Sequence, residues 1–101
     1  MKIAILGFGL EGRALADYFL KKGAEAEARD ENEVKDVPKN ARTKFGKDYL
    51  NSLGGFDVVF RSPGIPFLNP KIQQALKSGV HISSLTKYFF DRYASFSSPM
   101  K

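Results

Sequence analysis

The segment KIAILGFGLEGR, residues 2–13, contains the strongest structural signal in the chain. Its apolar run at residues 3–6 is short, continuous and followed at once by glycine, which is typical of a strand buried on both faces of a parallel sheet. Gly7, Gly9 and Gly12 then form the pattern Gly-x-Gly-x-x-Gly. The first glycine of this pattern permits a tight turn, the second lets a phosphate approach the main chain, and the third lets helix and strand pack closely. The segment therefore predicts a strand, a turn and a helix that together suit an anion.

Strands and helices alternate along the rest of the chain. The apolar spacing predicts a helix over residues 11–22, with Ala14, Leu15, Tyr18 and Phe19 on its inner stripe and Gly23 ending it. Further strands are predicted at residues 25–29, 43–45, 57–60 and 80–82, and further helices at residues 48–53, 70–77 and 85–93. In the helix at 70–77, Asn69 is the expected cap and Ile72, Ala75 and Leu76 the buried residues. This alternation predicts the α/β class: a Rossmann-like three-layer sandwich with a mostly parallel sheet of about five strands.

Three polar or glycine-rich features each follow a predicted strand: residues 7–12, Asp30, and residues 62–64. The carboxyl ends of parallel strands meet at one edge of a sheet, where ligands of open α/β sheets bind. Main-chain amides at the start of the first helix favour an anion there, and the carboxylate of Asp30 can accept hydrogen bonds from ribose hydroxyls. A purely structural glycine turn and a capping role for Asp30 remain the alternatives. The residues alone indicate a nucleotide or a dinucleotide other than NADP, whose 2′-phosphate Asp30 would repel.

The segment DVVFRSPGIP, residues 57–66, resembles the Ser-Pro-Gly-Ile-Pro signature of Mur ligase N-terminal domains. The residues that follow, from Asn69 to Ile82, continue the similarity, which covers about residues 2–91. The opening Gly-x-Gly-x-Glu-Gly-Arg is similar to a variant found among the D-glutamate-adding members of the family. The resemblance implies a domain that binds the UDP part of UDP-N-acetylmuramoyl-L-alanine, within an ATP-dependent ligase of peptidoglycan biosynthesis.

The resemblance also implies roles for individual residues. The glycine turn and the start of the helix hold the pyrophosphate, the acid after the second strand and its neighbours hold ribose and uracil, and the Ser-Pro-Gly loop lies against the nucleotide. In this sequence these positions are Gly9, Leu10, Glu11, Gly12, Asp30, Glu31, Asn32, Ser62, Pro63 and Gly64. ATP and Mg²⁺ belong to the parent enzyme, and no catalytic residue, cofactor or metal is expected in this chain.

Two positions depart from the family pattern. Many relatives have a small hydroxyl residue where this chain has Glu11, and a carboxylate there would repel a pyrophosphate. Either Arg13 neutralises Glu11 or Glu11 turns away, and the sequence leaves both alternatives open. Relatives can also place an arginine near the position of Asn32 to stack on uracil, which asparagine does less well.

The ligation chemistry of the family needs a phosphate-binding loop, and the chain contains no Gly-x-x-x-x-Gly-Lys-Ser/Thr sequence. We expect residues 1–93 to form the UDP-binding domain and residues 94–101 to act as a linker towards a central ATP-binding domain. The chain alone should then perform no ligation. An exposed apolar patch near Tyr88, Phe89 and Phe96 should mark the surface that the next domain normally covers, and the expected partners of the chain are the central and C-terminal domains of its own enzyme.

Composition limits the remaining classes of function. The 101 residues suffice for one domain, and the net charge of +5 comes from lysines and arginines that are scattered among acids rather than gathered in a stripe. Nucleic-acid binding is therefore not expected. The apolar run at residues 3–6 is far too short to span a membrane, so membrane insertion is not expected either and the cytoplasm is the expected location. The single histidine, His81, has no second ligand in sight, and a surface or packing role is expected. An NAD-binding Rossmann domain or another Mur ligase remains the alternative, although Ser-Pro-Gly argues against the L-alanine-adding enzyme.

Overall fold

The computed structural model describes residues 1–85 of the chain. Strand β1 (Lys2–Leu6) is followed by helix α1 (Leu10–Lys21) and by strands β2 (Glu25–Asp30), β3 (Arg42–Phe45) and β4 (Val58–Arg61). Helix α2 (Pro70–Lys77) and strand β5 (His81–Ser84) complete the described part. Within it the five strands form one sheet in the order β3-β2-β1-β4-β5, and every neighbouring pair is parallel. The predicted α/β class and the mostly parallel sheet of about five strands are confirmed.

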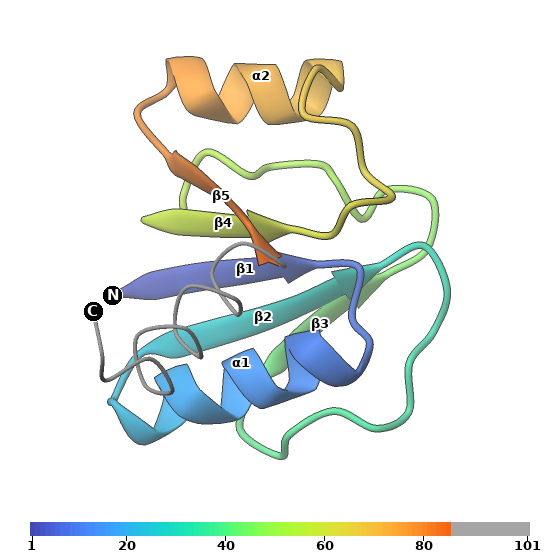
Figure 1. Cartoon of the computed structure of the whole chain (residues 1–101), viewed down its shortest axis with the longest axis vertical. Helices are drawn as coiled ribbons and strands as arrows, with labels where there is room; N and C mark the ends of the chain where they lie inside the picture. Colours follow the sequence, from blue (N-terminus) through green and yellow to red (C-terminus); the bar gives the residue numbers. More distant parts are fainter. Residues whose placement is uncertain (86–101) are drawn as a thin grey trace, which may run out of the picture.

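The central strand β1 is covered on both faces. Residues 3–6 have no exposed surface, as their unbroken apolar run predicts. Alternate side chains of a strand point to opposite faces, so Ile5 joins the core cluster that contains Leu15 of α1, whereas Leu6 joins the cluster that contains Ile72 of α2. The two helices therefore cover opposite faces of the sheet, as Figure 1 shows. The result is the predicted three-layer sandwich.

Helix α1 packs through positions spaced by three and four residues. Gly12, Leu15 and Ala16 are buried, and Phe19 packs against the same cluster. The predicted place of Ala14 on this stripe is wrong, because Ala14 is exposed and Ala16 takes the inner position. Ala14 and Ala16 lie on either side of Leu15, so the sequence does not show which of them faces the sheet. The rotation of the helix about its own axis decides this.

Helix α2 begins and ends as the sequence predicts. The side chain of Asn69 accepts a hydrogen bond from the N–H of Lys71 at 2.8 Å, and Pro70 is the first helical residue. Gly79 follows the helix with a φ of 96°, in the left-handed region. The predicted burial of Leu76 is wrong, since its side chain is 41% exposed. A helix of eight residues presents only a narrow stripe to the sheet.

The predicted short helix at residues 48–53 is also wrong. The segment forms successive turns, in which the N–H of Tyr49 bonds to the carbonyl of Gly46 at 3.1 Å and the N–H of Asn51 bonds to that of Asp48 at 3.0 Å. Ser52 then adopts a φ of 60°, which interrupts any right-handed helix. Three carbonyls of this segment accept hydrogen bonds from the side chain of Arg29, so they are not available for the main-chain hydrogen bonds of a helix.

The predicted helix at residues 85–93 lies outside the described residues except for Leu85, as do the predicted linker at 94–101 and the patch of Tyr88, Phe89 and Phe96. These remain predictions. Among the helices within residues 1–85, none combines the length and the apolar character needed to cross a membrane.

Candidate functional site

The turn after β1 strongly favours glycine at its first position. Gly7 has a φ of 82°, and its N–H donates to the carbonyl of Arg29 at 2.8 Å. A Cβ placed on Gly7 would lie 2.5 Å from Oγ of Ser62, far inside van der Waals contact. The conformation and the missing side chain together let the turn after β1 lie directly against the loop after β4.

The start of α1 leaves main-chain amides without a side-chain cap. The N-cap residue is Gly9, and the first helical hydrogen bond runs from the N–H of Arg13 to the carbonyl of Gly9 at 2.9 Å. The N–H groups of Leu10, Glu11 and Gly12 precede this bond and have no partner within the helix. A Cβ on Gly9 would meet no side chain or backbone beyond its chain neighbours within 4 Å, and Gly9 itself is exposed. Such a helix start is suited to binding an anion.

The third glycine of the motif serves packing. A Cβ on Gly12 would lie 3.1 Å from Cγ2 of Ile5 and 3.3 Å from Cδ1 of Phe8. Glycine at this position therefore sets how closely α1 lies on β1, as the motif predicts.

Asp30, the last residue of β2, fastens two neighbouring segments. Its Oδ2 accepts a hydrogen bond from the N–H of Phe8 at 2.8 Å, and its Oδ1 accepts one from the N–H of Asn32 at 2.9 Å. The structural role that the sequence left open for Asp30 is thus present. A carboxylate has about four acceptor positions, so these two bonds leave room for further donors.

The Ser-Pro-Gly-Ile-Pro loop is fixed at both ends of its first turn. The N–H of Ser62 donates to the carbonyl of Leu6 at 3.0 Å, and the N–H of Ile65 donates to that of Ser62 at 3.0 Å. Nη1 of Arg61 donates to the carbonyl of Ile65 at 2.9 Å. These bonds hold the loop tightly at the end of β4.

The structure brings the three predicted segments to one edge of the sheet. Strands β2, β1 and β4 are neighbours in this order and run parallel. Gly7 follows the carboxyl end of β1, Asp30 is the last residue of β2, and Ser62 follows the carboxyl end of β4. The contact of Gly7 with Ser62 and the bond from Phe8 to Asp30 join them directly. The other predicted contact positions lie exposed around this edge: Gly9, Leu10, Glu11, Glu31, Asn32, Pro63 and Gly64.

Residues 1–84 match the family model of the Mur ligase MurD-like N-terminal domain. The chain belongs to this family. It is 31% identical over 96 residues to the UDP-N-acetylmuramoylalanine–D-glutamate ligase of Clostridium kluyveri, a match that covers 87% of this chain and 21% of that enzyme. The enzyme of the same name from Acetivibrio thermocellus is 35% identical over 98 residues, covering 89% and 21%. The chain thus spans about a fifth of the length of these curated relatives.

A solved structure supports the same fold for this MurD-like domain. The UDP-N-acetylmuramate-alanine ligase of Thermotoga maritima superposes with a TM-score of 0.68 at 20% sequence identity, covering 96% of this chain and 24% of that one. At this level of identity the likeness concerns the fold alone.

Arg13 of the MurD-like domain pairs with residues other than Glu11. Within the described residues its ion pairs go to Asp17, at 3.5 Å, and to Asp36 in the loop after β2. Neutralisation of Glu11 by Arg13, one of the two alternatives from the sequence, is therefore not the arrangement found. Arg13 instead ties the loop that carries Glu31 and Asn32 to helix α1.

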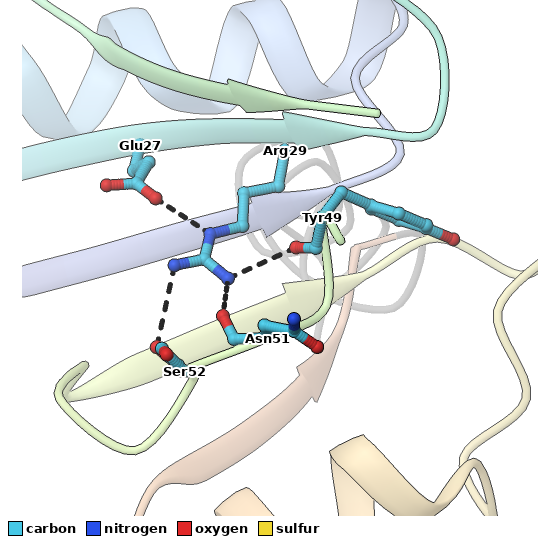
Figure 2. Close-up of polar contacts among 5 residues, drawn as sticks. All are labelled: Glu27, Arg29, Tyr49, Asn51 and Ser52. Atoms are coloured by element: carbon cyan, nitrogen blue, oxygen red, sulfur yellow. Dashed lines mark hydrogen bonds and ion pairs between the residues drawn. The ribbon is translucent and has the colours of Figure 1, made fainter. Parts of the chain in front are cut away.

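A network around Arg29 was not anticipated from the sequence (Figure 2). The side chain is 4% exposed, and its Nε donates to Oε2 of Glu27 at 2.7 Å. Nη1 donates to the carbonyls of Tyr49, at 3.1 Å, and Asn51, and Nη2 donates to that of Ser52 at 3.5 Å. One buried guanidinium thereby fixes the path of the segment between β3 and β4. The feature of the sequence that could have indicated this network is the pair Glu27 and Arg29, an acid and a base two residues apart on one face of a predicted strand.

The phenol of Tyr49 has a pKa that is shifted from its ordinary value. Burial raises the pKa of its phenol above the ordinary value of 10.0, and the negative charges of Glu31 and Asp30 raise that pKa further. The charges of Glu31 and Asp30 therefore act on the phenol of Tyr49.

A metal site is not formed in the described part of the chain. Within residues 1–85, no three His, Cys, Asp or Glu side chains are grouped so as to hold a metal ion.

Proposed function

We propose that this chain is the UDP-binding domain of a ligase that adds D-glutamate to UDP-N-acetylmuramoyl-L-alanine. The observation that carries the proposal is the meeting of uncapped helix amides, the Asp30 carboxylate and the Ser62 loop at one edge of the sheet. Membership of the MurD-like family and the two similar D-glutamate ligases support this choice of nucleotide.

The diphosphate would bind at the start of α1. The amides of Leu10, Glu11 and Gly12 carry the partial positive charge of the helix start, and the N-cap Gly9 is exposed and has no side chain that could cap them. Glu11 is exposed, so its carboxylate can remain in water while its main-chain N–H contacts a phosphate oxygen.

The uridine would lie across the ends of β2 and β4. Asp30 has acceptor positions left for ribose hydroxyls, and the exposed Glu31 and Asn32 follow it directly. Residues 62–64, held by the bonds of Ser62 to Leu6 and Ile65, would form the opposite wall.

The parent enzyme would supply the chemistry of ligation. In this proposal residues 1–93 form the UDP-binding domain, residues 94–101 lead towards a central domain that binds ATP and Mg²⁺, and a C-terminal domain completes the ligase. The chain spans about a fifth of its relatives, which is consistent with one domain of several. The expected setting is peptidoglycan biosynthesis in the cytoplasm. The chain alone would bind the UDP ligand weakly and perform no ligation.

Titration of the ¹⁵N-labelled chain with UDP-N-acetylmuramoyl-L-alanine and, separately, with NAD tests the proposal. We expect amide shifts confined to residues 9–12, 30–32 and 62–64 with the UDP compound and no saturable shifts with NAD. Preferential binding of NAD would instead establish a dinucleotide-binding domain. Shifts scattered over the surface would remove the assignment of this edge.

A further inference from the structure

Tyr49 is attached to the end of β2 through the turn that follows β3. The N–H of Gly46 donates to the carbonyl of Asp30 at 3.0 Å, and the N–H of Tyr49 donates to the carbonyl of Gly46 at 3.1 Å. Gly46 has a φ of 107°, which turns the chain at this point. The main chain of Tyr49 is therefore two hydrogen bonds away from Asp30, at the edge where the proposed nucleotide site lies.

The side chain of Arg29 also holds the main chain of Tyr49. Its Nη1 donates to the carbonyl of Tyr49 at 3.1 Å, and Arg29 itself is held by Glu27 and lies over the ring of Phe56, 5.1 Å from the ring centre. Figure 2 shows the ring of Tyr49 pointing away from the guanidinium. Because the guanidinium is buried and makes four hydrogen bonds, the main chain of Tyr49 is held in place before any ligand binds.

The ring of Tyr49 is only partly covered by the protein. It packs against the core cluster on the α2 face and is half-buried. The negative charges of Glu31 and Asp30 help to raise the pKa of its phenol, in keeping with the two hydrogen bonds that join the main chain of Tyr49 to Asp30. A half-buried aromatic ring on a fixed main chain loses little conformational freedom when a flat ligand packs on it.

We propose that the ring of Tyr49 is a contact surface for the nucleobase of the bound nucleotide. The inference rests on the proposed function, since Asp30 is taken to hold the ribose, and the base attached to that ribose then lies near the end of β2. Aromatic rings pack on every nucleobase because each base has a π-face. Tyr49 would thus add affinity for the base, while the helix amides bind the diphosphate.

Two probes separate the base from the diphosphate. The 101-residue chain is titrated with UDP and with inorganic pyrophosphate, and binding is followed by amide chemical shifts. Tyr49→Leu should weaken UDP binding roughly tenfold, as expected for loss of one aromatic–base contact, and should leave pyrophosphate binding unchanged. Tyr49→Phe keeps the ring and should bind UDP nearly as the original chain does.

Leu50→Ala is the matched control. Leu50 neighbours Tyr49 and packs against the same core cluster, so its truncation loosens the packing without removing the ring. It should leave the ratio of UDP affinity to pyrophosphate affinity unchanged, whereas Tyr49→Leu should lower that ratio.

The outcomes distinguish this inference from the function on which it rests. If the original chain binds neither UDP nor UDP-N-acetylmuramoyl-L-alanine, both are overturned. If it binds UDP and Tyr49→Leu binds UDP equally well, only the role of Tyr49 is overturned. A loss with Tyr49→Phe as large as that with Tyr49→Leu would assign the effect to the hydroxyl and would also reject a contact made by the ring.

Discussion

The carboxylate of Asp30 accepts the main-chain N–H of Phe8 at 2.8 Å, so the last residue of β2 fastens the turn that follows β1. The two residues are 22 positions apart in the sequence, and this bond joins two of the three segments at the proposed site. Asp30 is thus a structural residue of the turn as well as a candidate ligand of the ribose. Mutation should affect both properties.

Asp30→Ala should lower both stability and affinity for UDP. The change leaves the N–H groups of Phe8 and Asn32 without their charged acceptor, and hydrogen bonds to charged groups contribute about 1.5–3 kcal/mol. Urea denaturation followed by circular dichroism gives the free energy of unfolding. Asp30→Asn retains one acceptor and should cost less. Equal stability of the Ala variant and the original chain would show that the turn is held without Asp30.

Gly7→Ala should destabilise the fold even without ligand. A left-handed conformation costs a residue with a Cβ about 1–2 kcal/mol, and the overlap with Ser62 adds to this cost. Adding Ser62→Gly should recover the part due to overlap but not the part due to φ. A double variant no more stable than Gly7→Ala would contradict the contact between these two residues.

Gly9→Ala should separate binding from stability. Its Cβ would meet no atom within 4 Å beyond its chain neighbours, and Gly9 has a φ of −113°, so the free energy of unfolding should fall only by about 1 kcal/mol, the usual cost of alanine at an N-cap. The added methyl group stands on the N-cap residue, next to the amides proposed to bind the diphosphate, so UDP binding should weaken more than stability does, in a titration followed by amide shifts. Unchanged UDP affinity would place the diphosphate somewhere other than the start of this helix.

Much of this edge could be predicted because its signals are local. The run at residues 3–6 reflects burial on both faces, and the turn depends on glycines whose φ or lack of Cβ the structure requires. Asp30 follows a predicted strand in a class of fold whose strands end at a common edge. Each of these inferences needs only neighbouring residues and the rule that parallel strands share an edge.

The Arg29 network could not be predicted because its acceptors are main-chain carbonyls. Carbonyl groups occur at every position, so nothing in the sequence marks those of Tyr49, Asn51 and Ser52 as partners of Arg29. The same network explains why the predicted helix at residues 48–53 is wrong. Its turn residues are compatible with a helix locally, and a contact about twenty residues away decides the conformation.

Arg29→Met should cost about 3–5 kcal/mol, the usual range for breaking a buried ion pair, because Glu27 and three carbonyls lose their partner. Arg42→Met is the matched control. Arg42 lies on the neighbouring strand, its side chain is 69% exposed, and it is 3.8 Å from Glu25, so its loss should cost less than about 1 kcal/mol. Urea denaturation of both variants provides the comparison. Similar losses would show that burial gives Arg29 no special role.

Tyr49 should make the stability of the chain fall at alkaline pH. Its pKa is raised in the folded chain by burial and by Glu31 and Asp30, whereas in the unfolded chain the phenol ionises near its ordinary value of 10.0. Above that pH the unfolded state therefore binds fewer protons than the folded state, and stability decreases until the folded-state pKa is passed. Below it, this phenol makes no contribution to the pH dependence.

Tyr49→Phe removes that contribution and keeps the packing of the ring. Free energies of unfolding measured in urea at about pH 8, 9, 10 and 11 should run parallel for the two proteins at the lower values and diverge at the higher ones, with the original chain losing more. The two proteins differ only in this hydroxyl group, so the difference between their curves isolates Tyr49. Parallel curves over the whole range would mean that neither burial nor the charges of Glu31 and Asp30 raise the pKa of this phenol.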